Sequence, residues 1–341
     1  MKPLDITQRG TEIDDLEESI LHFVIGQDAA VHTVVESWQM FQAGLSPEGR
    51  PVASHLFLGP TGVGKTRLCE VLPEVILGDK RALIRIDCAE FQHGHEIAKL
   101  IGSPPGYLGH RETHPALSQE ALNKYHTANC QLSFILFDEI EKASDTLWNL
   151  LLAILDKATL TLGDNRKVDF SHTMIFMTSN LGSKEIEAAL RGGIGFQPPK
   201  GVTDEVGASA ARKRFTPEFI NRLDHIITFR SLTRGHLQKI LDLELSSLQM
   251  RIMRAASDKK APPFLFTVSE EAKDRLLTDG IDPRYGARYL KRTIDKDILR
   301  PIVNLLTSKQ VRSGESLQVG MERGKFHFSL STPVTSVGAQ N

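Results

Sequence analysis

The sequence feature that most constrains the fold is a glycine-rich segment at residues 59–66, which reads Gly-Pro-Thr-Gly-Val-Gly-Lys-Thr. An apolar run at residues 56–58 stands directly before it, and a segment able to form a helix begins at Arg67. Glycines followed by Lys-Thr in this context are typical of a phosphate-binding loop, which presents bare backbone N–H groups at a helix N-terminus. The segment therefore predicts a strand–loop–helix unit that binds a nucleotide.

The residue types of this loop suit phosphate and a divalent cation. Glycine permits a tight loop and a close approach of backbone to phosphate, although a plain glycine-rich turn after a buried strand is the simpler alternative. Lys65 is expected to reach the β- and γ-phosphates, and the Thr66 hydroxyl to ligate Mg²⁺. The expected cofactor-binding residues of the loop are Gly59, Pro60, Thr61, Gly62, Val63, Gly64, Lys65 and Thr66.

The composition excludes several classes of protein. Basic residues number 41 against 42 acidic ones, so the net charge of −1 gives no support for binding nucleic acid. The N-terminus lacks the apolar region of a signal peptide, and no run of about 18 apolar residues is present to span a membrane. Three cysteines without a CxxC pair indicate a reducing compartment. We therefore expect a cytoplasmic protein that binds neither nucleic acid nor membrane.

Apolar runs alternate with helical patterns along the first two thirds of the chain. Strands separated by helices predict an α/β fold with a three-layer parallel sheet. The helix after the phosphate loop contains Pro73, which is expected to kink it or end it early, at a cost of about 3 kcal/mol in a regular helix. The expected strands are residues 56–58, 83–87, 133–137, 174–178 and 225–229.

The pattern changes after Arg230, where long amphipathic helical segments replace the alternation. Three helices and a closing strand pair are expected there, which predicts a smaller, mostly helical domain. The helices are expected at residues 233–253, 269–277 and 287–306, and the strands at residues 316–319 and 325–330. The expected organisation is an N-terminal extension at residues 1–13, a large P-loop domain at 14–230, a small C-terminal domain at 231–331 and a tail at 332–341.

Acidic and amide side chains follow two of the expected strands. Asp138 is expected to hold Mg²⁺, usually through water, and Glu139 to polarise the water that attacks the γ-phosphate of ATP. Asn180 ends the next strand, and because adjacent parallel strands end at one crevice, its side chain can reach the same water. Taken singly, the acids suit solvated strand ends and Asn180 suits a turn. Together with the phosphate loop they indicate an ATPase.

Eight segments, in one order, resemble the motifs of Clp-family AAA+ ATPases, closest to the second ATPase domain of ClpB and ClpA and more distantly ClpX. The resemblance covers residues 14–320, and it implies a P-loop AAA+ domain followed by a small C-terminal lid domain. The segments are VIGQDAAV (24–31), LFLGPTGVGKT (56–66), RIDCAEF (85–91), LIGSPPGYLG (100–109), ILFDEIEKA (135–143), MTSNLGS (177–183), PEFINRLD (217–224) and DPRYGARYLKR (282–292).

The resemblance also implies roles for individual residues. Val24 and Ile25 would line the adenine pocket, and Asn180 would be the sensor-1 residue. Arg222 would be the arginine finger that reaches the γ-phosphate of a neighbouring subunit, and Arg288 the sensor-2 arginine of its own subunit. An arginine finger acting in trans requires a ring, so a homo-oligomer, a hexameric ring, is implied.

A tyrosine between glycines resembles the central pore loop of the family. The glycines would let the loop swing, while Tyr107 would offer a broad, sequence-indifferent surface to an unfolded polypeptide. An ordinary turn with a buried tyrosine is the alternative. The residues of the implied pore loop are Gly106, Tyr107, Leu108 and Gly109.

A second loop segment resembles the one with which ClpX and ClpA dock onto a ClpP-like peptidase. Apolar side chains between glycines and prolines suit an exposed docking loop, whereas an internal anchor of a long loop is the simpler alternative. The residues concerned are Ile194, Gly195 and Phe196.

Some positions depart from the family pattern. Thr216 stands where an arginine often precedes Pro-Glu-Phe, and residues 110–113 replace a more acidic run. A separate N-terminal substrate domain, a first ATPase ring and a coiled-coil middle domain are not expected within this chain. These departures leave hydrolysis intact and bear on the choice of substrate and partner.

Two classes of function fit these features. The first is an ATP-driven protein unfoldase or remodelling chaperone that threads unfolded or tagged proteins past Tyr107, with or without a peptidase. The second is a regulatory or nucleic-acid-remodelling switch ATPase whose nucleotide state controls a partner. Tyr107 and the near-neutral charge favour the first class. The complete set of catalytic residues argues against an idle scaffold.

Overall fold

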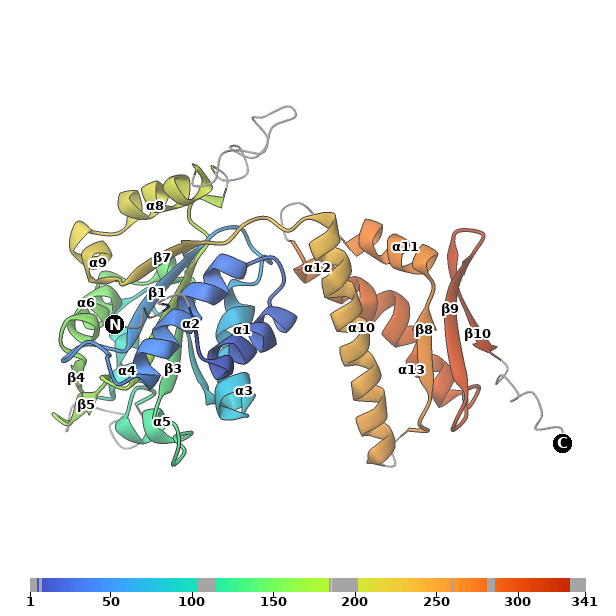
Figure 1. The fold of residues 1–341 in the computed structure, drawn as a ribbon, viewed down its shortest axis with the longest axis horizontal. Coiled ribbons are helices and arrows are strands. Elements are labelled where there is room, and N and C mark those ends of the chain that lie inside the picture. The colour runs from blue at the N-terminus through green and yellow to red at the C-terminus, as the bar shows by residue number, and fades with distance from the viewer. Residues whose placement is uncertain are drawn as a thin grey trace. The chain divides into compact units, whose positions relative to one another are not determined.

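The chain forms two compact units in the computed structural model, Met1–Ser231 and Leu232–Asn341 (Figure 1). None of the helices in the described part of the chain is both long and apolar enough to cross a membrane. The structure describes residues 5, 8–103, 115–183, 185, 202–258, 261–280 and 286–331.

The first unit is built on a five-stranded sheet in the order β2-β3-β6-β1-β7. All four neighbouring pairs are parallel, which confirms the predicted parallel α/β fold. The register aligns the carboxyl ends of the central strands, with Leu58 opposite Ser179 and Phe137 opposite Met177. The strands are β1 (Ala53–Leu58), β2 (Leu83–Asp87), β3 (Ser133–Asp138), β6 (Thr173–Ser179) and β7 (His225–Thr228).

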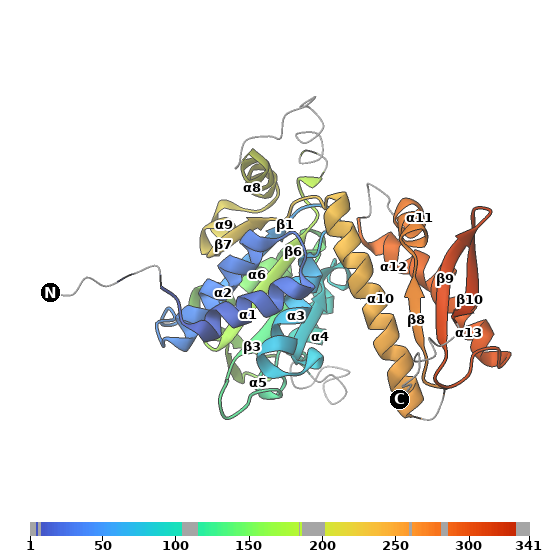
Figure 2. The same cartoon turned by 45° about the vertical axis from the view of Figure 1, so that its right-hand side comes forward.

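One face of this sheet packs against the first three helices (Figure 2). These are α1 (Thr11–Phe23), α2 (Asp28–Gln42) and α3 (Lys65–Leu77). Fully buried strand residues such as Phe57 join helix residues such as Leu68 in one hydrophobic core. The helices cover the sheet here because each carries an apolar stripe that must be removed from water.

The other face has a separate core, so the unit has three layers. It contains Leu56 of β1 and Leu151 of α6 (Asp145–Lys157), together with Phe219 of α9 (Pro217–Arg222). Neighbours along β1 point to opposite faces, which is why Leu56 and Phe57 belong to different cores. Further elements are α4 (Ala98–Ile101), α5 (Gln119–Asn123), α8 (Val202–Arg214), β4 (Thr159–Thr161), β5 (Lys167–Asp169) and the short helical turns η1 (Lys80–Ala82), η2 (Cys88–Glu90), η3 (Gly94–Ile97) and η4 (Ile140–Lys142).

Pro73 does not end its helix early, because α3 continues to Leu77. Leu68, Leu72 and Pro73 itself are buried in this helix. Burial of an apolar side chain is worth about 1.5–3 kcal/mol, so two or three such residues offset the cost of one proline within the helix.

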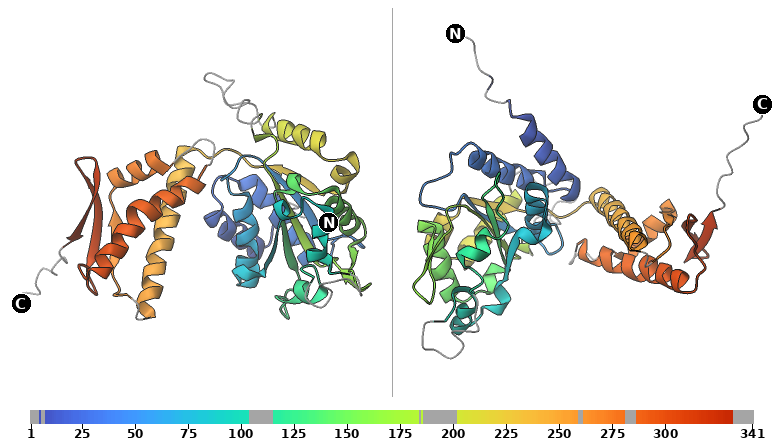
Figure 3. Two further views of the ribbon diagram at one scale, coloured as in Figure 1. Left: turned by 180° about the vertical axis from the view of Figure 1, so that it is seen from behind. Right: turned by 90° about the horizontal axis from the view of Figure 1, so that it is seen from below.

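The second unit has its own hydrophobic core and is mostly helical, as predicted (Figure 3). The third expected helix is divided: α12 and α13 are joined by a turn of π-helix at Asp295–Leu299, with Pro301 in the first turn of α13. The sheet has the order β10-β9-β8, and β8 was not predicted. The elements are α10 (Arg234–Ser257), β8 (Leu265–Val268), α11 (Glu270–Gly280), α12 (Arg288–Ile294), α13 (Arg300–Thr307), β9 (Ser316–Glu322) and β10 (Lys325–Ser331).

Candidate nucleotide site

The glycine-rich loop joins β1 to α3 in the way the sequence predicts. Gly59, Gly62 and Gly64 all have positive φ, at 131°, 77° and 112°, where side chains are strained. A Cβ on Gly59 would also lie 2.6 Å from the carbonyl oxygen of Phe229. Gly64 is the N-cap of α3 and supplies no side-chain cap. The helix N-terminus is therefore left for an outside acceptor, which suits a phosphate.

Lys65 places a cation inside the loop. Its side chain is buried, and Nζ donates to the carbonyl oxygens of Gly59 and Pro60 at 2.5 and 2.8 Å. It also donates to Oδ1 of Asn180 at 3.1 Å, and the Thr61 hydroxyl donates to the same oxygen at 3.3 Å. The loop and the end of β6 thus meet around one ammonium group. A buried cation beside an uncapped helix end fits a nucleotide phosphate.

The acid pair lies at the end of β3 and is held by the neighbouring strand. The Thr178 hydroxyl donates to Oδ1 of Asp138 and accepts the backbone N–H of Glu139 at 3.1 Å. Oδ2 of Asp138 accepts from Nη2 of Arg85 at 2.5 Å. Glu139 has a φ of 57°, a left-handed conformation unusual for this residue type and often found at functional sites. Its carboxylate binds Lys142 at 2.5 Å and thereby raises the pKa of Lys142.

The turn after Glu139 is tied to Asn180 and to α8. Oε1 of Glu141 accepts the backbone N–H of Asn180 at 3.1 Å, and its main-chain oxygen accepts from Arg214 at 2.9 Å. The Arg214 guanidinium lies 4.6 Å from the ring centre of Trp148. These contacts hold the turn after Glu139 between the end of β6 and the helices α6 and α8.

The segment expected to line the adenine pocket is attached to the phosphate loop by one buried amide. Val24 is buried and Ile25 is half-buried. Nε2 of the adjacent Gln27 donates to the carbonyl oxygens of Val63 at 3.1 Å and Arg230 at 2.9 Å, and Oε1 accepts the Arg230 N–H at 3.1 Å. Gln27 therefore fixes the distance between this segment and the loop.

Arg222 ends α9 and is anchored far from its own phosphate loop. Its main-chain oxygen accepts from Arg50 at 2.8 Å and lies 3.5 Å from the Ser54 hydroxyl, which donates to Oδ2 of Asp224 at 2.6 Å. Ser54 also donates its backbone N–H to Asp224 at 2.8 Å. Nε of Arg222 lies 2.8 Å from Oδ1 of Asp156, and the two side chains form an ion pair. The Nε–H group makes no hydrogen bond to this carboxylate.

The remaining predicted residues lie in the phosphate loop, in the second unit or outside the described residues. Thr66 is the second residue of α3, and Arg288 is exposed at the start of α12 in the second unit. The implied pore loop, residues 106–109, and the implied docking segment, residues 194–196, lie outside the described residues. Their roles stay predictions.

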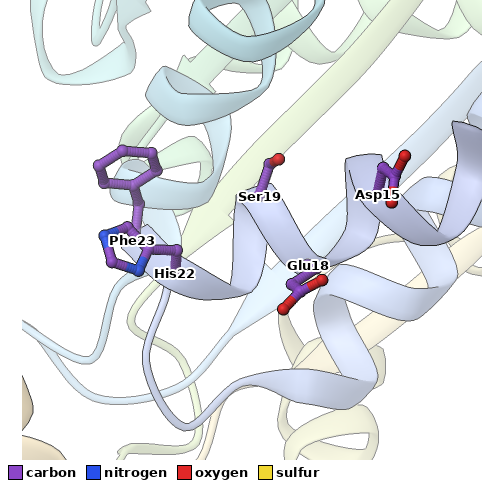
Figure 4. A pocket seen from close by; sticks show the side chains of 5 residues that line it. All are labelled: Asp15, Glu18, Ser19, His22 and Phe23. Atoms are coloured by element: carbon purple, nitrogen blue, oxygen red, sulfur yellow. The ribbon is translucent and has the colours of Figure 1, made fainter.

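A shallow pocket on α1 is distinct from this site (Figure 4). All of its lining residues come from that one helix, and none belongs to the loop or the acid pair. They are Asp15, Glu18, Ser19, His22 and Phe23.

Several residues of the site were missed from the sequence. Thr178 could have been found, because a parallel register that sets Met177 opposite Phe137 also brings Thr178 beside Asp138. Gln27 could also have been found, because it is an uncharged polar residue inside the VIGQDAAV segment, and such a residue in an apolar run can be buried. The structure shows that Gln27 is buried. Arg85 lies in the RIDCAEF segment, but neither its contact nor that of Arg50 could be predicted, since their partners are distant in the chain.

Comparison with known proteins identifies the family. Residues 50–226, just over half of the chain, match the AAA domain family (Cdc48 subfamily). The chain belongs to this family. Residues 232–319 match the C-terminal D2-small domain of ClpB protein, and both matches confirm the resemblance drawn from the motifs. This AAA protein is therefore of a nucleotide-binding, ATPase class.

The curated relatives of this AAA protein include ClpB chaperones. The chaperone protein ClpB of Rhodopirellula baltica is 36% identical over 314 residues, which cover 92% of this chain and 34% of the relative. Chaperone protein ClpB 1 of Parasynechococcus marenigrum is 39% identical over 315 residues, covering 92% and 34%. The AAA protein thus spans about a third of the length of these relatives.

Solved structures similar to this AAA protein include two of Hsp104. A closed state of Hsp104 with ATPγS and FITC casein has a TM-score of 0.79 at 29% identity, covering 93% of this chain and 52% of that one. An extended Saccharomyces cerevisiae Hsp104–casein complex has a TM-score of 0.80 at 29% identity, covering 94% and 53%.

Proposed function

We propose that this chain binds ATP with Mg²⁺ at the carboxyl ends of β1, β3 and β6 and hydrolyses the ATP there. The supporting observation is that Lys65, Asn180 and the Asp138–Glu139 pair, which come from three strands or their loops, meet at one edge of the sheet. Mg²⁺, when bound, neutralises phosphate charge, and Thr66 and Asp138 are the residues that would hold it.

Glu139 is proposed to orient and polarise the attacking water, and Asn180 to assist it. Thr178 holds both the carboxylate of Asp138 and the backbone N–H of Glu139, so the two acids keep a fixed relation. Such positioning matters because phosphoryl transfer depends mainly on placement and electrostatics.

Arg222 supports assembly into a ring. Its main chain is anchored beside Ser54 at the start of β1, whereas the phosphate loop begins at Gly59 after that strand ends. Five extended residues span about 16 Å, more than an arginine side chain reaches. An arginine placed there suits the nucleotide of a neighbouring subunit. We therefore propose a homo-hexameric ring, with Arg288 as the sensor-2 residue of the same subunit.

The proposed substrate is unfolded protein. The relatives are named as chaperones, and the two similar Hsp104 structures contain casein. We propose that Tyr107 in the pore loop, residues 106–109, grips the polypeptide as hydrolysis proceeds. Docking of a ClpP-like peptidase through Ile194, Gly195 and Phe196 is a separate part of the proposal.

The decisive experiment separates hydrolysis from threading. Glu139→Gln is expected to lower ATP turnover by at least about a hundredfold while ADP and ATP still bind, because it removes the polarising carboxylate. Tyr107→Ala should keep basal turnover and lose unfolding of a labelled model protein, with Tyr125→Ala as the matched control. Persistent hydrolysis in the first variant would refute the assignment of the acid, and intact unfolding in the second would refute threading.

Peptidase docking is tested by co-purification. A ClpP-like peptidase should be retained by the wild-type ring and lost after the double change Ile194→Ser, Phe196→Ser. If the peptidase is retained equally by the wild type and the variant, or is retained by neither, the peptidase is removed from the proposal. The chain would then act as a stand-alone remodeller.

A further inference from the structure

The Asp138 carboxylate already has a cationic partner within this chain. Nη2 of Arg85 lies 2.5 Å from Oδ2, while the Thr178 hydroxyl donates to Oδ1. The side chain of Asp138 is only 14% exposed, whereas that of Arg85 is 51% exposed. Both carboxylate oxygens therefore accept a hydrogen bond, and one of the two donors belongs to a long side chain that can move.

Mg²⁺ would need the same carboxylate. This ion takes near-octahedral oxygen ligands and is usually held in nucleotide sites by one or two carboxylates, directly or through its waters. An oxygen that accepts a guanidinium N–H has less electron density to offer a metal or a metal-bound water. Two cations at one carboxylate also repel each other. Arg85 and a bound Mg²⁺ would therefore compete for Asp138.

Arg85 has a second acceptor close by. Its Nη1 lies 3.7 Å from Oε1 of Glu70, which is on α3 five residues after Lys65. The Glu70 side chain is 43% exposed, so it can shift without disturbing the core. A small rotation of the guanidinium would exchange the short contact with Asp138 for a short contact with Glu70.

We propose that Arg85 is a resident cation on Asp138, that Mg²⁺ bound with nucleotide displaces it, and that Glu70 receives it. Arg85 is a positioning residue in this scheme: it holds Asp138 between turnovers and sets how tightly Mg²⁺ is coupled to nucleotide. The inference rests on the proposed role of Asp138 in holding Mg²⁺.

The test measures binding and needs no hydrolysis. The full chain is titrated with ADP by calorimetry, once in excess Mg²⁺ and once in EDTA. The quantity compared is the dissociation constant in EDTA divided by the dissociation constant in Mg²⁺. This ratio isolates the Mg²⁺ contribution from the general loss of positive charge near phosphate. Arg85→Gln should raise the ratio roughly three- to tenfold, the range of a partly exposed charge pair. Arg85→Lys, which keeps the charge, should raise it less.

The second acceptor predicts a change of opposite sign. Glu70→Gln removes the site that receives the guanidinium, so Arg85 should stay on Asp138 and the ratio should fall roughly two- to threefold. Arg81→Gln is the matched control, because Arg81 is exposed and pairs with Asp79 at 2.8 Å on the same edge of the unit. Its ratio should equal that of the wild type.

Asp138→Asn separates this inference from the proposed function. If that variant keeps the wild-type ratio, Asp138 does not hold Mg²⁺, and both this assignment and the present inference are overturned. If the ratio collapses towards one while Arg85→Gln leaves it unchanged or lowers it, the nucleotide site stands and the resident cation is refuted. Thermal melting of each variant establishes that the protein titrated is folded.

Discussion

The Arg50 guanidinium donates a hydrogen bond to the main-chain oxygen of Arg222 at 2.8 Å. The same side chain donates to the carbonyl oxygen of Leu155 at 3.3 Å and lies 3.6 Å from Asp224. Arg50, which precedes β1, therefore joins the end of α6, the last residue of α9 and the residue before β7. The main chain of the proposed arginine finger is fixed, and its side chain alone is left to reorient.

Arg50→Ala should release that main chain. We expect ATP turnover to fall about five- to tenfold and the free energy of unfolding to fall by about 1–2 kcal/mol, since two hydrogen bonds from a charged group are lost. Steady-state ATPase assays and urea unfolding measure the two effects. Arg166→Ala is the control, because Arg166 forms exposed ion pairs with Asp164 and Glu120. Unchanged turnover in Arg50→Ala would show that the anchor does not matter for catalysis.

Arg222→Ala should act on neighbouring subunits. When variant and wild-type chains are mixed in rising proportion, ATP turnover should fall more steeply than the fraction of variant, because each altered subunit also disables the site it faces. The measurement is ATPase activity against mixing ratio, with wild type mixed with Arg166→Ala as reference. A straight line would contradict an arginine finger acting in trans.

Thr178→Val removes one hydroxyl and keeps the shape of the side chain. Thr178 is 2% exposed, so the variant leaves the backbone N–H of Glu139 without its acceptor. We expect kcat to fall at least about tenfold while ADP affinity changes less than threefold, as for a lost positioning contact. Thr178→Ser restores the hydroxyl and should restore most of kcat. Equal kcat in Thr178→Val and wild type would remove the hydroxyl from the mechanism.

A buried histidine makes stability depend on pH. Neither ring nitrogen of His55 has a hydrogen-bond partner in the described part of the chain, and the ring stacks on Phe176 and His225 at 5.4 and 5.0 Å. Burial, with a contribution from the His225 charge, lowers the pKa of His55 to about 3. Between pH 3 and the ordinary value near 6.5, only the unfolded chain binds this proton. The contribution of His55 to stability is therefore full above pH 6.5 and falls as the pH drops below it, by at most about 1.4 kcal/mol per pH unit.

Melting temperatures of the wild type and His55→Phe between pH 7.5 and 5.5 check this expectation. Phenylalanine can keep the stack on Phe176 and does not titrate, so the variant should lose less stability on acidification. His22→Gln, at an exposed histidine, should follow the wild type. Parallel curves for wild type and His55→Phe would place the source of the acid sensitivity elsewhere.

The central strands β1, β3 and β6 could be predicted because their apolar runs are buried on both faces and read as strands without alternation. The edge strand β8 was missed, since Leu265–Val268 alternates between exposed and half-buried residues and is short. Pro73 did not end α3 early, because the packing of that helix against the sheet outweighs the local preference of proline to end a helix. Local signals predicted elements well where burial and propensity agree.

The parts of the site that lie within single motifs could also be predicted. Lys65 and Asn180 were named from their own segments, and they meet at 3.1 Å. Arg85 and Arg50 could not be named, because their partners are 53 and 172 residues away and the contacts depend on which strands are neighbours. Strand order and register are tertiary properties, so the residues that support the site required the structure.

The indole of Trp148 gives the turn after Glu139 an optical reporter. The chain has two tryptophans, and the Trp148 N–H donates to the carbonyl oxygen of Ile140 at 3.2 Å, one residue after Glu139. The Arg214 guanidinium over its ring adds a nearby charge. With Trp38 replaced by phenylalanine, the remaining emission comes from Trp148 alone. Movements of the turn during a single turnover can then be followed in unlabelled protein by intrinsic fluorescence.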